Sequence, residues 1–577
     1  MPSLGRLAAA SAGAALLLSN ALAAPVHAPP TFDPPGSARP PRLAYLPVPG
    51  PASFVVIARD VLDIAFSLDP SLASGAGMHE DAIRAPSFSA ASVAALTKRL
   101  DRDLSAMRKE SWRRWPIDTQ MDFRWIFATA ENLRNQLNVE KLYTHRPASW
   151  LEPYANNLIA LASYAPERPE LQDRVLALAP AMLAEMQVIA AAPTAEDVDT
   201  GRDLALALAR MAAARNAEPA RSAFTAYASF LTTQATVAPF SVVGAQDYAW
   251  RYRHTLLLPW TPTELLAQAN VALTTLDARM AGLPPGSAPQ ATAEQNTAAE
   301  ALNGHSLLAL YDSIEEAHRA ATVRGGWVTI PDAVGPIHAR ETPEAMIPLT
   351  GDGGSMNPPP TWSASNVGYW NVEHFRADMS PADRLDTVVS AQNFLNNGMG
   401  PYAAHEGFPG HHLQLAIARL NPDPLRSILP DPAQNEGWGL YAEEVFWEHG
   451  GLGNSPDSER AYLRSYRARI MRVFYDVHIE SGEWTLQQAA DFKHDTPAGE
   501  SKVDEDILRS INWPTQLICY FSGKTQIIAL REAYKQKLGN TYTDRGFHDA
   551  FLAEGSIPIA LIRAKLLGEP IPDLPRE

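Results

Sequence analysis

Apolar residues return at helical spacing, every three or four positions, through most of the chain. In the first half this pattern runs from Phe54 to about Phe240, where abundant alanine suits closely packed helices. It returns at Pro381 and continues to the end of the chain, closing with the run 547–567. The spacing predicts a mainly α-helical protein. Because the first half shows no cluster of metal-ligating side chains along its sequence, we expect it to act as a scaffold.

The helical pattern is interrupted between Arg324 and Asn371. Two short runs there, 327–331 and 346–349, have the composition of strands, and the glycine and proline clusters that follow are typical of loops. A loop of this length inside a helical protein is usually functional or disordered. Three aromatic residues favour the functional interpretation: Trp362, Tyr369 and Trp370. We therefore expect a small β element and a functional loop in this segment.

The first residues have the features of a targeting signal. Arg6 supplies a positive charge, 7–18 is an apolar alanine and leucine run, and 21–23 is a small-x-small cleavage site. The run is shorter than the roughly 20 residues of a membrane span. We expect residues 1–23 to be a cleavable signal peptide, with a buried N-terminal helix as the alternative. The mature protein is then periplasmic or secreted and has no membrane span.

Residues 24–50 are rich in proline and alanine and show no apolar periodicity, which predicts an extended leader. No domain break is evident after it. We expect 51–577 to form a single helical catalytic domain. Within that domain, 51–320 is the predicted scaffold and 321–577 is the half that carries the metal site.

Composition narrows the possible partners. The chain has 577 residues and a formal net charge of -16, which argues against nucleic acid because phosphate binding needs clustered positive charge. A hydrophobic fraction of 46% with 19% charged residues is typical of a globular protein. Cys519 is the only cysteine, so no intramolecular disulfide can form. Any metal must therefore be held by histidine and carboxylate.

The strongest chemical signal is the stretch HEGFPGHH from His405 to His412. Zinc hydrolases often carry two histidines four positions apart on a helix, with a glutamate after the first as general base. Here the fourth position after His405 is Pro409, and the next histidines are His411 and His412. On a straight helix a seven-residue step covers about 10.5 Å. That is too far for two ligands that each bind one zinc ion at about 2.0–2.1 Å.

Three residues between the histidines can relieve this separation: Gly407, Pro409 and Gly410. Proline cannot sustain the helical hydrogen bond, and glycine permits unusual backbone dihedrals. We expect a bulge after His405 that brings His411 to the position of the usual second ligand. His412 remains the alternative ligand.

A third ligand is expected from the helix predicted to follow Pro432. Gly437 and Gly439 each cost such a helix roughly 1 kcal/mol relative to alanine. That cost is tolerated where another backbone must approach closely, as beside a metal site. We predict that Glu436 is the third metal ligand. Glu443, two turns further along the same face, is then an outer or helix-pairing carboxylate.

These motifs resemble those of a bacterial family called domain of unknown function 885, which is placed among the gluzincin-like metallopeptidases. The blocks that carry the resemblance are 368–371, 405–414, 436–443, 476–485, 513–524 and 547–558. The thimet oligopeptidase and carboxypeptidase Taq groups are similar more distantly. Their Gly-His pair at the second ligand favours His411 over His412. The resemblance implies a large, mainly α, multi-helical gluzincin-like fold with a deep cleft.

The resemblance also implies a chemical role for each residue of the two central blocks. His405, His411 and Glu436 would hold one Zn²⁺ ion and leave a position for water. Glu406 would accept the proton of that water and later deliver it to the leaving amine.

Residues of the later blocks are candidates for substrate contacts. Tyr520 or His478 would donate a hydrogen bond to the developing negative charge of the carbonyl oxygen, although each could instead be a core residue. Lys524 and Arg531 could bind a peptide carboxylate or lie on a solvated helix face.

The predicted function is hydrolysis of peptide or peptide-like amide bonds by an exported zinc enzyme, with a peptide or small amide as substrate. One alternative is a zinc hydrolase of another ester or amide bond. A second is a helical binding protein with a degenerate metal site, against which the intact His405, Glu406 and Glu436 argue. The sequence does not specify an oligomeric state.

Overall fold

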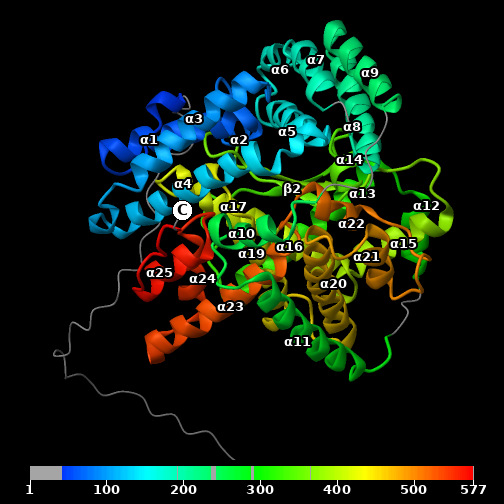
Figure 1. Cartoon of the computed structure of the whole chain (residues 1–577). Coiled ribbons are helices and arrows are strands. Elements are labelled where there is room, and N and C mark those ends of the chain that lie inside the picture. The colour runs from blue at the N-terminus through cyan, green and yellow to red at the C-terminus, as the bar shows by residue number, and fades with distance from the viewer. Residues whose placement is uncertain (1–41, 191–192, 235–241, 287–290, 364, 576–577) are drawn as a thin grey trace, which may run out of the picture.

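The computed structural model describes residues 42–190, 193–234, 242–286, 291–363 and 365–575. Within these residues the chain is mainly helical with one small sheet, as predicted (Figure 1). The predicted signal peptide and most of the predicted leader fall in 1–41 and lie outside the described residues. No helix in the described ranges has both the length and the apolar character needed to cross a membrane.

The helices of the first half are α1 (Ala52–Leu68), α2 (Ser71–Gly75), α3 (Ala90–Met107), α4 (Ile117–Asn135), α5 (Ala148–Tyr164), α6 (Glu170–Leu176), α7 (Ala179–Ile189), α8 (Ala195–Ala214), α9 (Glu218–Thr232), α10 (Ala245–His254), α11 (Pro262–Ala281), α12 (Ala293–Glu300) and α13 (Gly304–Gly325).

The helices of the second half are α14 (Ile347–Thr350), α15 (Pro381–Gln392), α16 (Met399–Glu406), α17 (His411–Ala418), α18 (Leu425–Ile428), α19 (Pro432–Glu448), α20 (Pro456–Glu480), α21 (Leu486–His494), α22 (Glu505–Asn512), α23 (Cys519–Leu538), α24 (Asp544–Leu552) and α25 (Ile559–Leu567).

Several helices begin where the sequence supplies a cap. At α15, the side chain of Ser380 accepts a hydrogen bond from the backbone N–H of Asp383, whose carboxylate accepts from the backbone of Ser380 in return. At α19, the Asp431 carboxylate accepts from the backbone N–H of Gln434, and proline occupies the first helical position. The helix predicted after Pro432 is therefore confirmed.

The sheet has three strands in the order β1-β3-β2. Their bounds are β1 (Ile337–Glu341), β2 (Ser355–Asn357) and β3 (Gly368–Val372). β1 runs parallel to β3, and β2 runs antiparallel to it. Trp370 at the centre of β3 is fully buried, and its ring packs against Tyr311 of α13 and Tyr402 of α16. These contacts place the sheet beside α16.

A small β element was expected, but both predicted strand positions are wrong. The run 327–331 forms no strand, because side chains take its backbone groups: His548 donates to the carbonyl of Trp327, and Asp549 accepts from the N–H of Thr329. The run 346–349 instead leads into α14, where Pro348 in the first turn favours a helix start.

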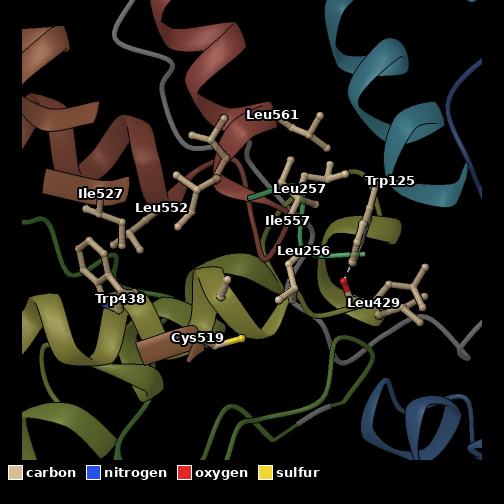
Figure 2. Close-up of a cluster of buried hydrophobic side chains, with 14 of the residues drawn as sticks. Trp125, Leu256, Leu257, Leu429, Trp438, Cys519, Ile527, Leu552, Ile557 and Leu561 are labelled. Carbon is tan, nitrogen blue, oxygen red and sulfur yellow. Dashed lines mark hydrogen bonds between the residues drawn. The ribbon is translucent and has the colours of Figure 1, made fainter. Parts of the chain in front are cut away.

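The main hydrophobic core crosses the two predicted halves of the domain. Trp125 of α4 donates its indole N–H to the carbonyl of Leu429, just before α19, over 3.1 Å. Figure 2 shows both residues in one buried cluster with Trp438 of α19 and Cys519 of α23. A second buried cluster is built mainly within α5–α9, which group at the upper right of Figure 1. The predicted scaffold and metal-site halves therefore share one core.

The end of the predicted leader is packed against the domain. Leu43, Leu46 and Val48 are buried in the main core. The described part of this segment, 42–50, therefore contributes side chains to the folded domain rather than only linking it to the signal.

Candidate metal centre

The HEGFPGHH segment is divided between two helices. α16 ends at Glu406 and α17 begins at His411, so the distortion expected here is a complete break between two helices rather than a bulge within one. Glycine is required at both ends of the break. A Cβ atom on Gly407 would lie 1.7 Å from Oε2 of Glu315, and one on Gly410 would lie 1.9 Å from the carbonyl oxygen of His405.

The break brings together the three residues predicted to bind metal. His405 Nε2 and His411 Nε2 each lie 3.4 Å from Glu436 Oε2. One ligand atom from each residue falls within 4.8 Å of the others. Two ligands bound at about 2.1 Å to a tetrahedral centre are roughly 3.4 Å apart. The spacing of these three atoms therefore suits one zinc-sized ion.

Outer hydrogen bonds orient both imidazoles. His405 Nδ1 donates to Glu443 Oε1 over 2.9 Å, and His411 Nδ1 lies 3.3 Å from Gln414 Oε1. With Nδ1 engaged in this way, each ring presents Nε2 to Glu436, as metal-binding histidines commonly do.

An outer hydrogen bond also holds the carboxylate of Glu436. Its Oε1 accepts a hydrogen bond from Gln516 Nε2 over 3.0 Å. Its Oε2 is buried and has no hydrogen-bond partner among the described residues. A buried carboxylate oxygen without a donor costs free energy, and a cation at the point where the two Nε2 atoms converge would remove that cost.

Electrostatics favour a positive charge at this point. Burial lowers the pKa of His405, but the carboxylates of Glu436 and Glu443 more than reverse this and raise it to about 10. Burial raises the pKa of Glu436, but the neighbouring imidazoles of His405 and His411 take it well below its ordinary value. The ionised carboxylates therefore draw in a cation, either a proton or a metal ion.

The two glycines of α19 allow close approaches, as predicted, but to different partners. A Cβ atom on Gly439 would lie 2.6 Å from Cε1 of His405, so this glycine makes room for the imidazole. A Cβ atom on Gly437 would lie 2.5 Å from the backbone of Gly523, so this one lets α23 pack against α19. Trp438, between them, donates its indole N–H to the carbonyl of Pro409 and holds the break in place.

Glu406, the predicted general base, follows His405 at the end of α16 and is 6% exposed. None of the described residues donates a hydrogen bond to its carboxylate. Both of its oxygens are therefore available to accept a hydrogen bond from a water molecule.

The two predicted oxyanion donors lie in different places. The ring of Tyr520, in the first turn of α23, stacks on the His405 ring with centroids 5.9 Å apart. His478, in the last turn of α20, instead stacks on Trp484 and bonds to Glu483. The structure therefore brings Tyr520 to the cluster and directs His478 into the turn after α20.

His412, the alternative ligand, points away from the cluster. Its Nε2 donates to the carbonyl of Gly335 over 2.9 Å, and a Cβ atom on Gly368 would lie 2.4 Å from its Nδ1. Burial lowers the pKa of His412 to about 4. This histidine packs α17 against the sheet.

Lys524 and Arg531 are engaged within the protein. The Lys524 ammonium is fully buried, forms an ion pair with Glu444 and lies 3.4 Å from the centre of the Tyr466 ring. Arg531 forms an ion pair with Asp544 over 2.9 Å. Both cations stabilise helix packing, so neither is placed to bind a substrate carboxylate.

Two residues that orient the ligands from outside, Gln414 and Gln516, were not predicted from the sequence. Gln414 lies three positions after His411, a helical spacing that could have identified it. Gln516 comes from the loop before α23, and no local pattern connects it with Glu436.

The structure contains a cavity of about 510 Å³ that is not lined by His405, His411 or Glu436. Its walls come from α1, α4 and α5 on one side and from 429–432 and 512–516 on the other, and they include Trp125. Gln516 lines this cavity and also bonds to Glu436. The cavity therefore reaches the outer surroundings of the ligand cluster.

Comparison with known proteins places the chain in a family. The model of bacterial proteins of unknown function, DUF885, matches residues 70–566. The chain belongs to the DUF885 family. This confirms the family part of the predicted resemblance, while the wider likeness to gluzincins and thimet oligopeptidase stays a prediction. No curated protein matches the chain.

Two solved structures share the fold of this DUF885 protein. A candidate lipoprotein of unknown function from Shewanella oneidensis is 18% identical, with a TM-score of 0.67, and the match covers 90% of this chain and 100% of that one. A candidate lipoprotein from Colwellia psychrerythraea is 17% identical, with a TM-score of 0.63, and the match covers 89% of this chain and 98% of that one. At these identities the similarity shows the fold alone.

Proposed function

We propose that this DUF885 protein is an exported, zinc-dependent hydrolase that cleaves peptide or peptide-like amide bonds. One observation carries the proposal: His405 Nε2 and His411 Nε2 converge on the buried Oε2 of Glu436 at 3.4 Å each. Two imidazoles and one carboxylate are a ligand set typical of catalytic zinc, which keeps a further position open for water or substrate.

The surroundings of the cluster support a resident metal ion. Glu443 and Gln414 engage the Nδ1 atoms of the two histidines, and Gln516 engages the second oxygen of Glu436. Partners of this kind tune the basicity and the orientation of metal ligands. An ordinary buried histidine–carboxylate pair needs no such arrangement around a shared centre.

A zinc ion at this site would supply a water molecule of lowered pKa and polarise the substrate carbonyl. Glu406 accepts the proton of the attacking water and delivers it to the leaving amine. Tyr520 donates its phenolic hydrogen to the carbonyl oxygen as negative charge develops there. Its own oxygen accepts from Arg509 Nη2 over 3.1 Å, which leaves its proton free for the substrate.

Export is part of the proposal. The charged start, the apolar run and the small-x-small site of residues 1–23 support a cleavable signal. Both structural relatives are described as candidate lipoproteins, which is consistent with a location in the cell envelope. No cysteine lies near the predicted cleavage site of this chain, so the proposal is release after cleavage rather than lipid attachment.

The proposal is tested by metal analysis of the purified protein together with digestion of a mixed peptide library. We expect about one zinc per chain, cleavage of library peptides, loss of cleavage with a chelator and recovery when zinc is restored. Zinc without peptide cleavage would indicate a hydrolase of another bond. Neither zinc nor cleavage would indicate a helical binding protein and overturn the proposal.

A further inference from the structure

Three arginines surround the Tyr520 side chain. The guanidinium carbon of Arg472 lies 4.7 Å from the centre of the ring, that of Arg469 lies 5.9 Å away, and Arg509 donates to the phenolic oxygen. Arg469 and Arg472 come from α20, and Arg509 comes from α22. A concentration of positive charge therefore borders the candidate metal centre.

Among the described residues, one carboxylate forms ion pairs with these arginines. Asp506 forms an ion pair with Arg472 over 2.6 Å and lies 3.9 Å from Arg509. The closer contacts of Arg509 are to two neutral groups, the Gln516 amide and the Tyr520 hydroxyl. Arg472 and Arg509 thus share one carboxylate, which also pairs with Lys493, and Arg469 has no ion pair with it.

Of the three arginines, Arg469 has the weakest set of hydrogen-bond and ion-pair partners. Its Nη1 donates to the carbonyl of Ser465 at 3.5 Å, the limit of a hydrogen bond, and its buried Nε has no partner. In the described part of the chain, no carboxylate forms an ion pair with it. Its electrostatic neighbour Glu443 already accepts a hydrogen bond from His405. A half-buried guanidinium in this state has donors to spare for an anion.

A small anionic group can reach this region. The side chains of Arg509 and Glu436 are 21% and 18% exposed, and Arg472 is 12% exposed. The planar guanidinium matches a carboxylate better than any other common group in a peptide. A carboxylate beside Tyr520 would lie next to the ligand cluster, within reach of a bound peptide.

We infer that Arg469 and Arg509 bind a carboxylate of the substrate beside the scissile bond, so that the enzyme selects peptides with a C-terminal carboxylate or an acidic side chain at this position. The inference rests on the proposed function. It adds a substrate class, with Arg469 as the main specificity-determining residue and Arg509 as its partner.

The binding of peptides to an inactive variant tests this inference independently of catalysis. The Glu406→Gln variant, which is expected not to hydrolyse peptides, is titrated by calorimetry with trialanine and with trialanine amide. A second pair of probes consists of two tripeptide amides that differ only in a glutamate or glutamine side chain. A preference for the free acid assigns the C-terminal carboxylate, and a preference for glutamate assigns an acidic side chain. We expect one preference to reach at least about tenfold.

A matched pair of variants on α20 tests whether Arg469 causes the preference for a carboxylate. Arg469→Met, in the Glu406→Gln background, is expected to reduce the preference to less than about twofold while zinc content stays unchanged. Arg469→Lys keeps the positive charge but loses the planar pair of N–H donors, so it should retain part of the preference. Arg467→Met removes a guanidinium that pairs with Asp277 on another face of α20 and should leave the preference intact.

Equal affinity for both members of both pairs would overturn the inference. So would a full preference in both Arg469 variants, or an equal loss in the Arg467 variant. Failure of the proposed function has a different signature, because wild-type protein would then cleave none of the four probes or the library while the binding preference could still be measured.

Discussion

The first turn of α17 places two adjacent histidines in opposite surroundings. On one side, His411 joins His405 in pointing Nε2 at the ionised carboxylate of Glu436. On the other side, His412 packs against Gly368 of β3 and donates to a backbone carbonyl. Both histidines are buried, so burial alone does not distinguish them.

The difference lies in the carboxylates. Burial lowers the pKa of a histidine because it penalises the charged form. At His412 nothing reverses this, and the pKa falls to about 4. At His405 burial acts in the same direction, but Glu436 and Glu443 raise the pKa to about 10. The cluster that His405 of α16 forms with Glu436 and Glu443 therefore favours a cation, whereas the surroundings of His412 favour packing.

The largest effect is expected from Glu406→Gln, which tests whether the cluster formed by His405, His411 and Glu436 is a catalytic site. The amide cannot accept a proton, so hydrolysis should fall by about 10²–10⁴-fold. Bound zinc should be unchanged, because Glu406 is not in the ligand cluster. Peptide cleavage and metal content are measured together, with Glu500→Gln at an exposed position as control. Full activity in the Glu406 variant would refute its role as the base.

The contrast between neighbouring histidines can be tested directly by His411→Ala and His412→Ala. We expect His411→Ala to weaken zinc affinity by more than the roughly 100-fold that loss of an outer partner can cost. His412→Ala should keep its zinc but lower the free energy of unfolding by about 2–3 kcal/mol, through a cavity beside β3. Zinc titration and chemical denaturation measure these effects. Loss of zinc in the His412 variant alone would reverse the assignment.

A smaller effect is expected from Glu443→Gln. The amide keeps the size of the side chain but weakens the hydrogen bond that orients His405, so zinc affinity should fall by about 10–100-fold. Competition with a chromogenic chelator measures the affinity. Glu448→Gln, at the end of the same helix and paired with Arg531, serves as control and should bind zinc normally. Equal affinity in the two variants would show that Glu443 serves only helix packing.

The smallest effect is expected on the free energy of unfolding when the pH is lowered. Because the pKa of His412 in the folded state is about 4 and its ordinary value is 6.5, the unfolded chain binds more protons between these values. The contribution of neutral His412 to the free energy of unfolding is therefore present above pH 6.5 and is lost as pH falls toward 4. It should decrease by about 1 kcal/mol between pH 6.5 and 5.5. Denaturation curves at the two pH values should show this decrease in the wild type and less of it in His412→Asn; equal decreases would remove His412 as the cause.

Much of the candidate site could be predicted from short stretches of sequence. The residues Gly407, Pro409 and Gly410 already indicated that the helix could not continue from His405 to His411, and the structure has a break there. The helix carrying Glu436 was predicted from its proline start. That these residues bind metal stays a prediction, although the structure brings their ligand atoms together.

Other features could not be predicted because they depend on contacts between distant segments. The runs 327–331 and 346–349 have strand-like composition, yet His548 and Asp549 of α24 take the backbone groups of the first run. Tyr520 and His478 were equal candidates from the later blocks of the family resemblance. Only the packing of α23 against α19 brings Tyr520 to His405.

The sequence by itself determined the helical class, the break between the histidines and the types of side chain available to a metal. These properties follow from local propensity and spacing, which neighbouring residues settle among themselves. The tertiary structure alone decided that His411 rather than His412 faces Glu436, that Gln516 holds the second oxygen of Glu436, and that Arg469 borders Tyr520. Those relations depend on how α17, α19, α20 and α23 cross, and the crossings are set by packing between side chains far apart in the chain.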